Sequence, residues 1–346
     1  MGGVLLSLLI NTLLLRFSKS LGIRNKNDVI VRWSNESKPS LGGISMYVTF
    51  LFAVLFFAAA FSQEDVFENA AFLTVLAASS LAFTIGLADD AYNTRPLLKL
   101  SGQIICGVIF VIGGVTIDLF HHVYFDAAFT ILWVVVLMNS LNMLDNMDGI
   151  TGTVSFFVLL SCAVSFLIFN GFVHNYWIYV LIAILGAIIG FMRYNISPSK
   201  MFMGDAGSQF ISLVIAFFSI DGFWNIAAQF EVPSWSSLLL VLTVFTPAAV
   251  DTLTVVINRL KKGQSPMVGG KDHTTHHLVY KGLSDFKVWL VFLGLSVLSA
   301  LIAIILLILI SMGYYQLTLL GFVFFIIVFY FLYRNTIKHL PKENKS

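Results

Sequence analysis

Apolar runs separated by short polar segments fill almost the whole chain. Most of them are close to the 17–25 residues that a helix needs to cross about 30 Å of hydrocarbon. The pattern predicts eleven helices, over residues 4–17, 44–61, 70–87, 100–119, 127–141, 152–169, 177–192, 208–220, 236–257, 288–311 and 315–333. Because the first and fifth runs are short, we expect an all-α polytopic membrane protein with about 10–11 transmembrane helices.

The composition agrees with this pattern and excludes a water-soluble domain. Hydrophobic residues make up 58% of the chain and charged residues 11%, and the mean hydropathy is +0.90. Neither an internal repeat nor a separate soluble segment is visible, so residues 1–346 are expected to form a single integral membrane domain. Cys106 and Cys162 fall inside predicted helices and are expected to be core thiols.

The charges are divided unequally between the two sides of the membrane. Threading the chain through the predicted helices places all 20 Lys and Arg on one side and leaves acidic residues such as Glu64 and Asp118 on the other. By the positive-inside rule the basic side is cytoplasmic, and the odd number of helices puts the N-terminus outside. A cleaved signal peptide is the alternative for the first run, but that run lacks a basic leading segment and a small-residue cleavage site. The basic loops are short, which fits contact with membrane lipids and argues against nucleic acid as a partner.

Two adjacent carboxylates, Asp89 and Asp90, follow the third apolar run on the basic side. In a half-desolvated place such a pair is costly unless a cation or a metal-bound phosphate shares it. A solvated helix end is the equally open alternative for this pair alone.

A second polar cluster follows the fifth run, where Asn142, Asp145 and Asp148 recur at three-residue spacing. In a helix these positions share one face, and converging oxygen atoms suit Mg²⁺ or the hydroxyls of a sugar. A solvated loop seldom repeats such spacing between two apolar runs, so the pattern favours a functional site.

The third cluster lies directly before the eighth run, where Gly204 and Gly207 flank Asp205. Glycines beside a carboxylate allow the close backbone approach that a metal-phosphate site requires. A plain helix N-cap is the alternative for Asp205.

The fourth cluster is the His loop, residues 269–277, which contains His273, His276 and His277. A zinc site is one interpretation, but no Cys is nearby and no H-E-x-x-H helix is present. Anion binding by the imidazoles fits better, because the other clusters supply hard oxygen ligands. Incidental surface histidines are the remaining alternative.

The ninth run contains Pro247 four residues before Asp251. A proline there could break or tilt the helix and open a lateral groove for a lipid substrate near the boundary. The alternative is an ordinary kink, with Asp251 reaching out toward the membrane surface.

These clusters lie far apart in the sequence, yet all fall at the cytoplasmic boundary. Together they offer carboxylates for a metal ion, and Lys and His for phosphates, which are the groups used in phosphoryl transfer. A secondary transporter of anionic sugars is the alternative from another class. The predicted helix centres, however, carry almost no ionisable residue, and no repeat symmetry is evident.

Five motifs in this order resemble the polyprenyl-phosphate N-acetylhexosamine-1-phosphate transferases. They are the segment 38–43, the pair Asp89-Asp90, the Asn-x-x-Asp-x-x-Asp-Gly run at 142–149, the segment 202–208 and the His loop. The resemblance implies an enzyme of the bacterial cytoplasmic membrane that transfers a sugar 1-phosphate from a UDP-N-acetylhexosamine to undecaprenyl phosphate at the cytoplasmic face. It implies release of UMP, the start of a lipid-linked cell-surface glycan, and Mg²⁺ as cofactor with Mn²⁺ as the alternative ion; it leaves a homodimer open.

The resemblance also implies roles for single residues. Asp205 would be the main metal ligand, and Asp89 and Asp90 the pair that engages or deprotonates the lipid phosphate. The nucleotide-metal cleft would be lined by Asn142, Asp145 and Asp148, and the uridine would be flanked by Asn195 and Phe202. The diphosphate would be bound by His276 and His277, and the phosphates would lie near Lys38 and Lys99.

Two features depart from the family pattern. The family's histidine motifs run His-x-His-His or His-His-His, whereas here two threonines separate His273 from His276, so no role is carried over to His273. Asn146 stands where a glycine is common in the peptidoglycan branch, and Ser265-Pro266 looks like the N-acetylglucosamine-phosphate branch. We therefore favour a surface-polysaccharide initiator, with the phospho-N-acetylmuramoyl-pentapeptide transferase branch as the alternative.

Overall fold

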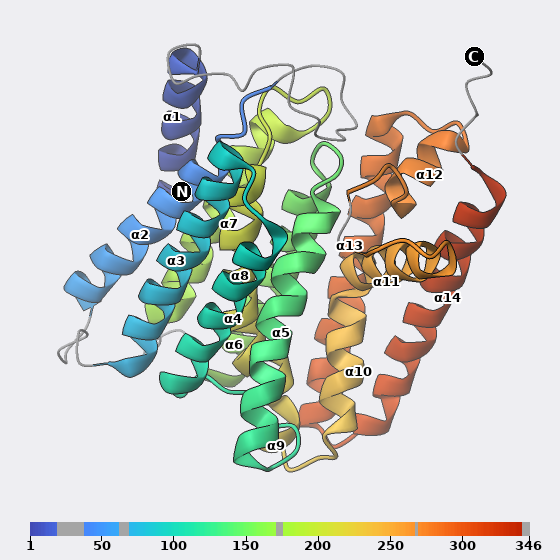
Figure 1. Cartoon of the computed structure of the whole chain (residues 1–346). Helices are drawn as coiled ribbons and strands as arrows, with labels where there is room; N and C mark the ends of the chain where they lie inside the picture. Colours follow the sequence, from blue (N-terminus) through green and yellow to red (C-terminus); the bar gives the residue numbers. More distant parts are fainter. Residues whose placement is uncertain (19–37, 62–68, 171–175, 267–268, 341–346) are drawn as a thin grey trace, which may run out of the picture.

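The computed structural model describes residues 1–18, 38–61, 69–170, 176–266 and 269–340, and within these residues it contains helices and no strand (Figure 1). Most helices run roughly parallel or antiparallel in one bundle. They are α1 (Gly2–Phe17), α2 (Gly42–Phe61), α3 (Ala70–Tyr92), α4 (Pro96–Ile112), α5 (Val123–Leu144), α6 (Ile150–Asn170), α7 (Tyr176–Asn195), α8 (Gly204–Ser219), α9 (Ile226–Gln229), α10 (Trp235–Val244), α11 (Thr246–Lys261), α12 (Thr274–Tyr280), α13 (Asp285–Ser311) and α14 (Thr318–Lys338).

The expected multi-pass membrane architecture is confirmed. Within the described residues, 8 helical spans are long and apolar enough to cross a membrane, and the bent pair α10 and α11 raises this to 9. The apolar helices α1 and α4 are shorter, with 16 and 17 residues. Each of the predicted runs therefore corresponds to a helix or helix pair. Cys106 and Cys162 are buried free thiols, as expected.

The helix α8 lies at the centre of the bundle, against α2, α3, α5 and α6. Every residue of α8 from Ala206 onward is buried. Close packing of membrane helices relies on small residues, and a Cβ added at Gly86 of α3 would overlap the backbone of Asp205 at the start of α8. This packing brings the carboxylates at the end of α3 beside the first turn of α8.

The ninth predicted helix is wrong as a single straight element. Its two parts, α10 and α11, meet at an angle of 88°, and α11 runs across the bundle in Figure 1 while α10 runs along it. Pro247 lies in the first turn of α11, where its missing N–H costs no hydrogen bond and its fixed φ starts a new helix. The predicted break at Pro247 is thus confirmed, and a lateral groove beside it stays a prediction.

Candidate active site

The ends of four helices bring together Asp89 of α3, Lys99 of α4, Asn142 of α5 and Asp205 of α8, which we call the central cluster. Lys99 Nζ lies 2.9 Å from Asp89 Oδ2, and 3.3 Å from both Asn142 Oδ1 and Asp205 Oδ1. The amide of Asn142 donates to Asp205 Oδ1 and, over 2.9 Å, to Ser208 Oγ. Three of the sequence clusters therefore form one site, and Lys99 is at its centre.

The two adjacent carboxylates are held by different partners. Asp89 Oδ1 accepts hydrogen bonds from the backbone N–H of Thr94 over 2.8 Å and from its hydroxyl over 2.6 Å. Asp90 Oδ2 instead accepts from the backbone N–H of Ala206 over 2.9 Å, at the start of α8. Gly204 has φ +76°, and a Cβ added there would lie 2.7 Å from Asp90 Oδ2. The glycine therefore leaves room for Asp90 against the positive end of the α8 dipole.

Asp145 adds a further carboxyl group directly after α5. Burial raises the pKa of Asp145 to about 8, and the nearby carboxylates of Asp205 and Asp90 raise it in the same direction. One lysine thus faces several carboxylates, and a cation among these oxygens would lower their mutual repulsion. Within the described ranges, no group of three His, Cys, Asp or Glu side chains is placed to hold a metal ion by itself.

Asp148 lies at a second corner of the site, with Lys38 and Phe202. Its carboxylate accepts from the backbone N–H of Ser199 over 3.0 Å and from the Ser199 hydroxyl over 2.8 Å. Lys38 Nζ lies 4.0 Å from Asp148 Oδ2 and 5.6 Å from the centroid of the Phe202 ring. This corner combines a cation, a carboxylate and an aromatic face.

Asn195 is 3% exposed, and protein groups occupy both ends of its amide. Its Oδ1 accepts from the Gly149 N–H over 3.0 Å, and its Nδ2 donates to the Met201 carbonyl over 2.9 Å. Asn195 therefore joins the loop that carries Asp148 to the loop that carries Phe202. Its direct contact with a uridine stays a prediction.

The His loop ends in α12, and its histidines are nearly buried, with 2% exposure for His276 and 4% for His277. Burial lowers the pKa of His276 to about 3 and also lowers that of His277. A neutral ring would contact an anion through its one N–H group rather than through charge. His276 Nδ1 accepts from the backbone N–H of His273 over 3.4 Å, which leaves the ring proton on Nε2. His277 Nδ1 lies 2.6 Å from the His339 carbonyl oxygen, so its proton is on Nδ1.

The side chains that hold the His loop were missed by sequence reasoning. Asp251 of α11 is fully buried, so the expectation that it reaches the membrane surface is wrong. Asp251 Oδ2 lies 2.8 Å from His273 Nδ1, while Oδ1 accepts from the Thr274 N–H over 2.8 Å and from its hydroxyl over 2.6 Å. The only signal in the sequence was an aspartate in an apolar helix shortly after a proline.

A second support is an ion pair between Arg259 and Asp272. Two guanidinium nitrogens donate to the two carboxylate oxygens over 2.8 and 2.7 Å, and a third donates to the Pro266 carbonyl over 2.8 Å. Burial raises the pKa of Asp272, but the bonds from Arg259 outweigh it and the net pKa is below the usual range. A bidentate pair of this kind fixes orientation as well as distance.

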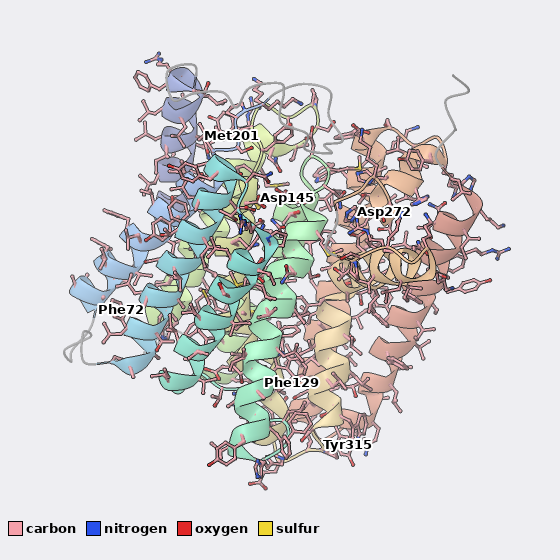
Figure 2. All side chains as sticks on the ribbon, viewed as in Figure 1. Phe72, Phe129, Asp145, Met201, Asp272 and Tyr315 are labelled. Carbon is pink, nitrogen blue, oxygen red and sulfur yellow. The ribbon has the colours of Figure 1, made fainter. Side chains whose placement is uncertain are left out.

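The clusters meet at one end of the bundle. In Figure 2, Met201, Asp145 and Asp272 are labelled in the upper half of the molecule, and Phe129 and Tyr315 in the lower half. The Thr275 hydroxyl of α12 donates over 2.6 Å to Asn146 Oδ1, which joins the His loop to the loop after α5.

Comparison with known proteins gives the family. The model of glycosyl transferase family 4 matches residues 72–223, a region that includes the whole central cluster. Over this region, which is less than half of the chain, the chain is similar to this family, and the relatives below support the same family. The protein is therefore a membrane-embedded transferase, and its His loop lies beyond the matched region.

Three relatives illustrate the similarity. The chain is 27% identical to a decaprenyl-phosphate N-acetylglucosaminephosphotransferase of Mycolicibacterium smegmatis over 75% of the chain and 70% of the relative. It is 24% identical to a probable undecaprenyl-phosphate N-acetylglucosaminyl 1-phosphate transferase of Bacillus subtilis, over 78% and 73%. It is also 29% identical to a phospho-N-acetylmuramoyl-pentapeptide-transferase of Streptococcus uberis, over 81% and 88%. Both branches of the resemblance are thus represented at similar identity.

Proposed function

We propose that this transferase moves an N-acetylhexosamine 1-phosphate from a UDP-sugar to undecaprenyl phosphate, releases UMP and starts a lipid-linked cell-surface glycan. The observation that carries this proposal is the central cluster, in which the Lys99 ammonium contacts the carboxylates of Asp89 and Asp205. Phosphoryl transfer is catalysed mainly by positioning and by neutralising the charge of the phosphates. The names of the mycobacterial and Bacillus relatives support the sugar and the lipid class.

The geometry supports a division of labour among the side chains. Asp89 orients Lys99 toward the phosphates, and Asp90, held at the start of α8, faces the acceptor phosphate. The corner with a cation and an aromatic face suits the uridine nucleotide. The proposed catalytic residues are Asp89, Asp90, Asp145 and Asp148, and the proposed substrate-binding residues are Lys38, Lys99, Asn142, Asn195, Phe202, His276 and His277.

A divalent ion fits the chemistry of this site. Carboxylate and amide oxygens are the donors that Mg²⁺ prefers, and Mn²⁺ accepts the same set. The crowding of carboxylates around Asp145 supports a cation here. We propose Asp205 as its main ligand with Asn142 beside it; the bound ion would supply charge neutralisation for the diphosphate.

The proposed location of the site is the cytoplasmic face of a bacterial inner membrane. Support comes from the placement of all 20 Lys and Arg on one side of the predicted topology, which is also the side of the polar clusters. UDP-sugars are water-soluble, whereas the acceptor lies in the bilayer, so a site at the boundary can bind both.

Turnover by purified protein in detergent tests the proposal. With undecaprenyl phosphate and Mg²⁺, we expect UMP release from UDP-N-acetylglucosamine or a related UDP-N-acetylhexosamine, and little release without the lipid. The S. uberis relative makes the muramoyl-pentapeptide donor the second candidate, so that donor is assayed in parallel. Preference for it would move the protein to the peptidoglycan branch, and absence of UMP release from every donor would contradict the proposed function.

A further inference from the structure

Two features that depart from the family pattern contact each other. The Thr275 hydroxyl, from the threonine pair between the histidines, donates a 2.6 Å hydrogen bond to Asn146 Oδ1 across a sequence separation of 129 residues. Asn146 Nδ2 donates to the Met143 carbonyl over 3.0 Å, which turns Oδ1 toward Thr275. A glycine at position 146 would offer no side chain for this contact.

The contact joins two parts of the proposed site through residues that are next in sequence to proposed functional residues. Asn146 follows Asp145, whose carboxylate is close enough to Asp205 and Asp90 to feel their charge. Thr275 precedes His276 in the first turn of α12. Together with a bond between His276 and the Asn146 backbone, this hydrogen bond therefore sets the spacing between the carboxylates and the histidine pair.

A different contact holds α12 on its other side. Thr274 and His273 bind the carboxylate of Asp251, which is fully buried in α11. Hydrogen bonds to a buried charge contribute more to stability than one neutral, partly buried hydrogen bond. Loss of the Asn146–Thr275 contact should therefore leave α12 folded on α11 but free its first turn to move relative to Asp145.

We propose that Asn146 and Thr275 are positioning residues for the donor, and that their hydrogen bond fixes the distance between the carboxylates and His276 across which the UDP-sugar diphosphate lies. The role rests on the proposed function. A contact that orders the site before the donor arrives lowers the ordering cost of binding, equally for the bound ground state and the transition state. Its loss should then raise the donor KM and leave kcat nearly unchanged.

The variants Thr275→Val and Asn146→Ala, singly and together, test this role. Each single variant should raise the donor KM about two- to tenfold, which corresponds to the free energy that one neutral hydrogen bond contributes. The kcat of each should stay within about twofold of wild type. The donor KM of the double variant should be no higher than that of the single variant with the higher KM, because both substitutions remove the same contact. Thr275→Ser keeps the hydroxyl and should stay near the wild-type KM.

The matched control is Thr252→Val, which removes a hydrogen bond of the same 2.6 Å length between α11 and Ser140 of α5. Thr252 does not contact α12 through this bond, so the donor KM should not change. Thermal midpoints in the same detergent should agree within about 3 °C among Thr275→Val, Asn146→Ala and this control.

Additive effects of the two substitutions on KM, a fall in kcat without a rise in KM, or an equal effect of Thr252→Val would each overturn the positioning role. An active wild type with unchanged KM in both single variants would overturn it as well, while leaving the proposed function intact. A wild type that releases no UMP from any UDP-sugar would instead contradict the proposed function, and the donor role with it.

Discussion

The central cluster and the His loop lie at the same end of the bundle but are supported in different ways. The side chains of the central cluster come from the ends of α3, α4, α5 and α8 and bind one another directly through Lys99. The His loop ends in a helix of 7 residues, and its position depends on Asp251 and Arg259 of the bent helix α11. In the central cluster, the residues proposed for the chemistry also hold one another in place. In the His loop, the residues proposed for the chemistry are held in place by other residues.

This difference leads to different expectations for substitutions. In the central cluster, removal of one charge should lower turnover while the long helices keep their fold. In the His loop, chemistry and folding should be separable, because the histidines can be removed without the residues that hold them. The two regions can therefore be told apart by comparing turnover with thermal stability.

The largest effect is expected for Asp205→Asn in the central cluster. An amide cannot supply the anionic ligand that Mg²⁺ favours, so UMP release at saturating Mg²⁺ should fall at least about 10³-fold, the equivalent of several kcal/mol. Asp221→Asn is the matched control, because Asp221 belongs to the same helical span, 204–229, away from the site. Retention of more than about a tenth of wild-type turnover by Asp205→Asn would reject Asp205 as the principal ligand.

In the His loop, His276→Ala should lower turnover by roughly 10²–10³-fold, because a donor to the leaving UMP is lost. His277→Ala should cost less turnover, because the one proton of its neutral ring is already donated to the His339 carbonyl. His276 is therefore the histidine at which the larger loss is expected, and its Nδ1 accepts from the His273 backbone, which leaves the proton on Nε2. His273→Ala should cost much less turnover. Thermal midpoints serve as the control for folding.

A zinc site would give a different result at the same three positions. All three alanine variants would then lose turnover equally, and chelation followed by readdition of Zn²⁺ at constant Mg²⁺ would switch activity off and on. Unchanged rates in all three variants would instead leave these buried histidines a purely structural role.

Much of the fold and of the central cluster could be predicted from the sequence, for a physical reason. Apolar length determines where helices cross a membrane, and polar residues at helix ends must meet at the same boundary. Asp89, Asn142 and Asp205 are at such ends, so their convergence followed from topology, although Lys99 as their common partner did not.

The support of the His loop could not be predicted in this way. Pro247 indicated a break but not its 88° angle, which depends on packing between α10, α13 and α14. That angle turns Asp251 inward to His273 and lets Arg259 reach Asp272. Contacts between a bent helix and a loop have no periodic signal in the sequence, so these residues were recognised only in the structure.

Asp251→Asn tests whether the His loop depends on its support. The amide would keep an acceptor for Thr274 but lose the charge that binds His273, so we expect a turnover loss of about 10- to 100-fold, from the range for hydrogen bonds to charged groups. Unlike Asp205→Asn, it should also lower the thermal midpoint. The double variant Asp251→Asn/His273→Ala should resemble Asp251→Asn alone, and a loss of turnover without any change in midpoint would contradict the separation of support from chemistry.

The smallest effects are expected for Asp89→Asn and Asp90→Asn, which sharpen the comparison within the central cluster itself. Each should lower turnover by at least about tenfold, or roughly 1.4 kcal/mol of transition-state stabilisation. Asp89 acts through Lys99, over 2.9 Å, so Asp89→Asn/Lys99→Met should be no worse than Lys99→Met alone. Asp90 binds the backbone of Ala206 rather than Lys99, so Asp90→Asn/Lys99→Met should show nearly the product of the two single losses. Near-wild-type rates in both single variants would make the pair a mere helix end, and equal coupling of both aspartates to Lys99 would show that their different partners do not give them different roles.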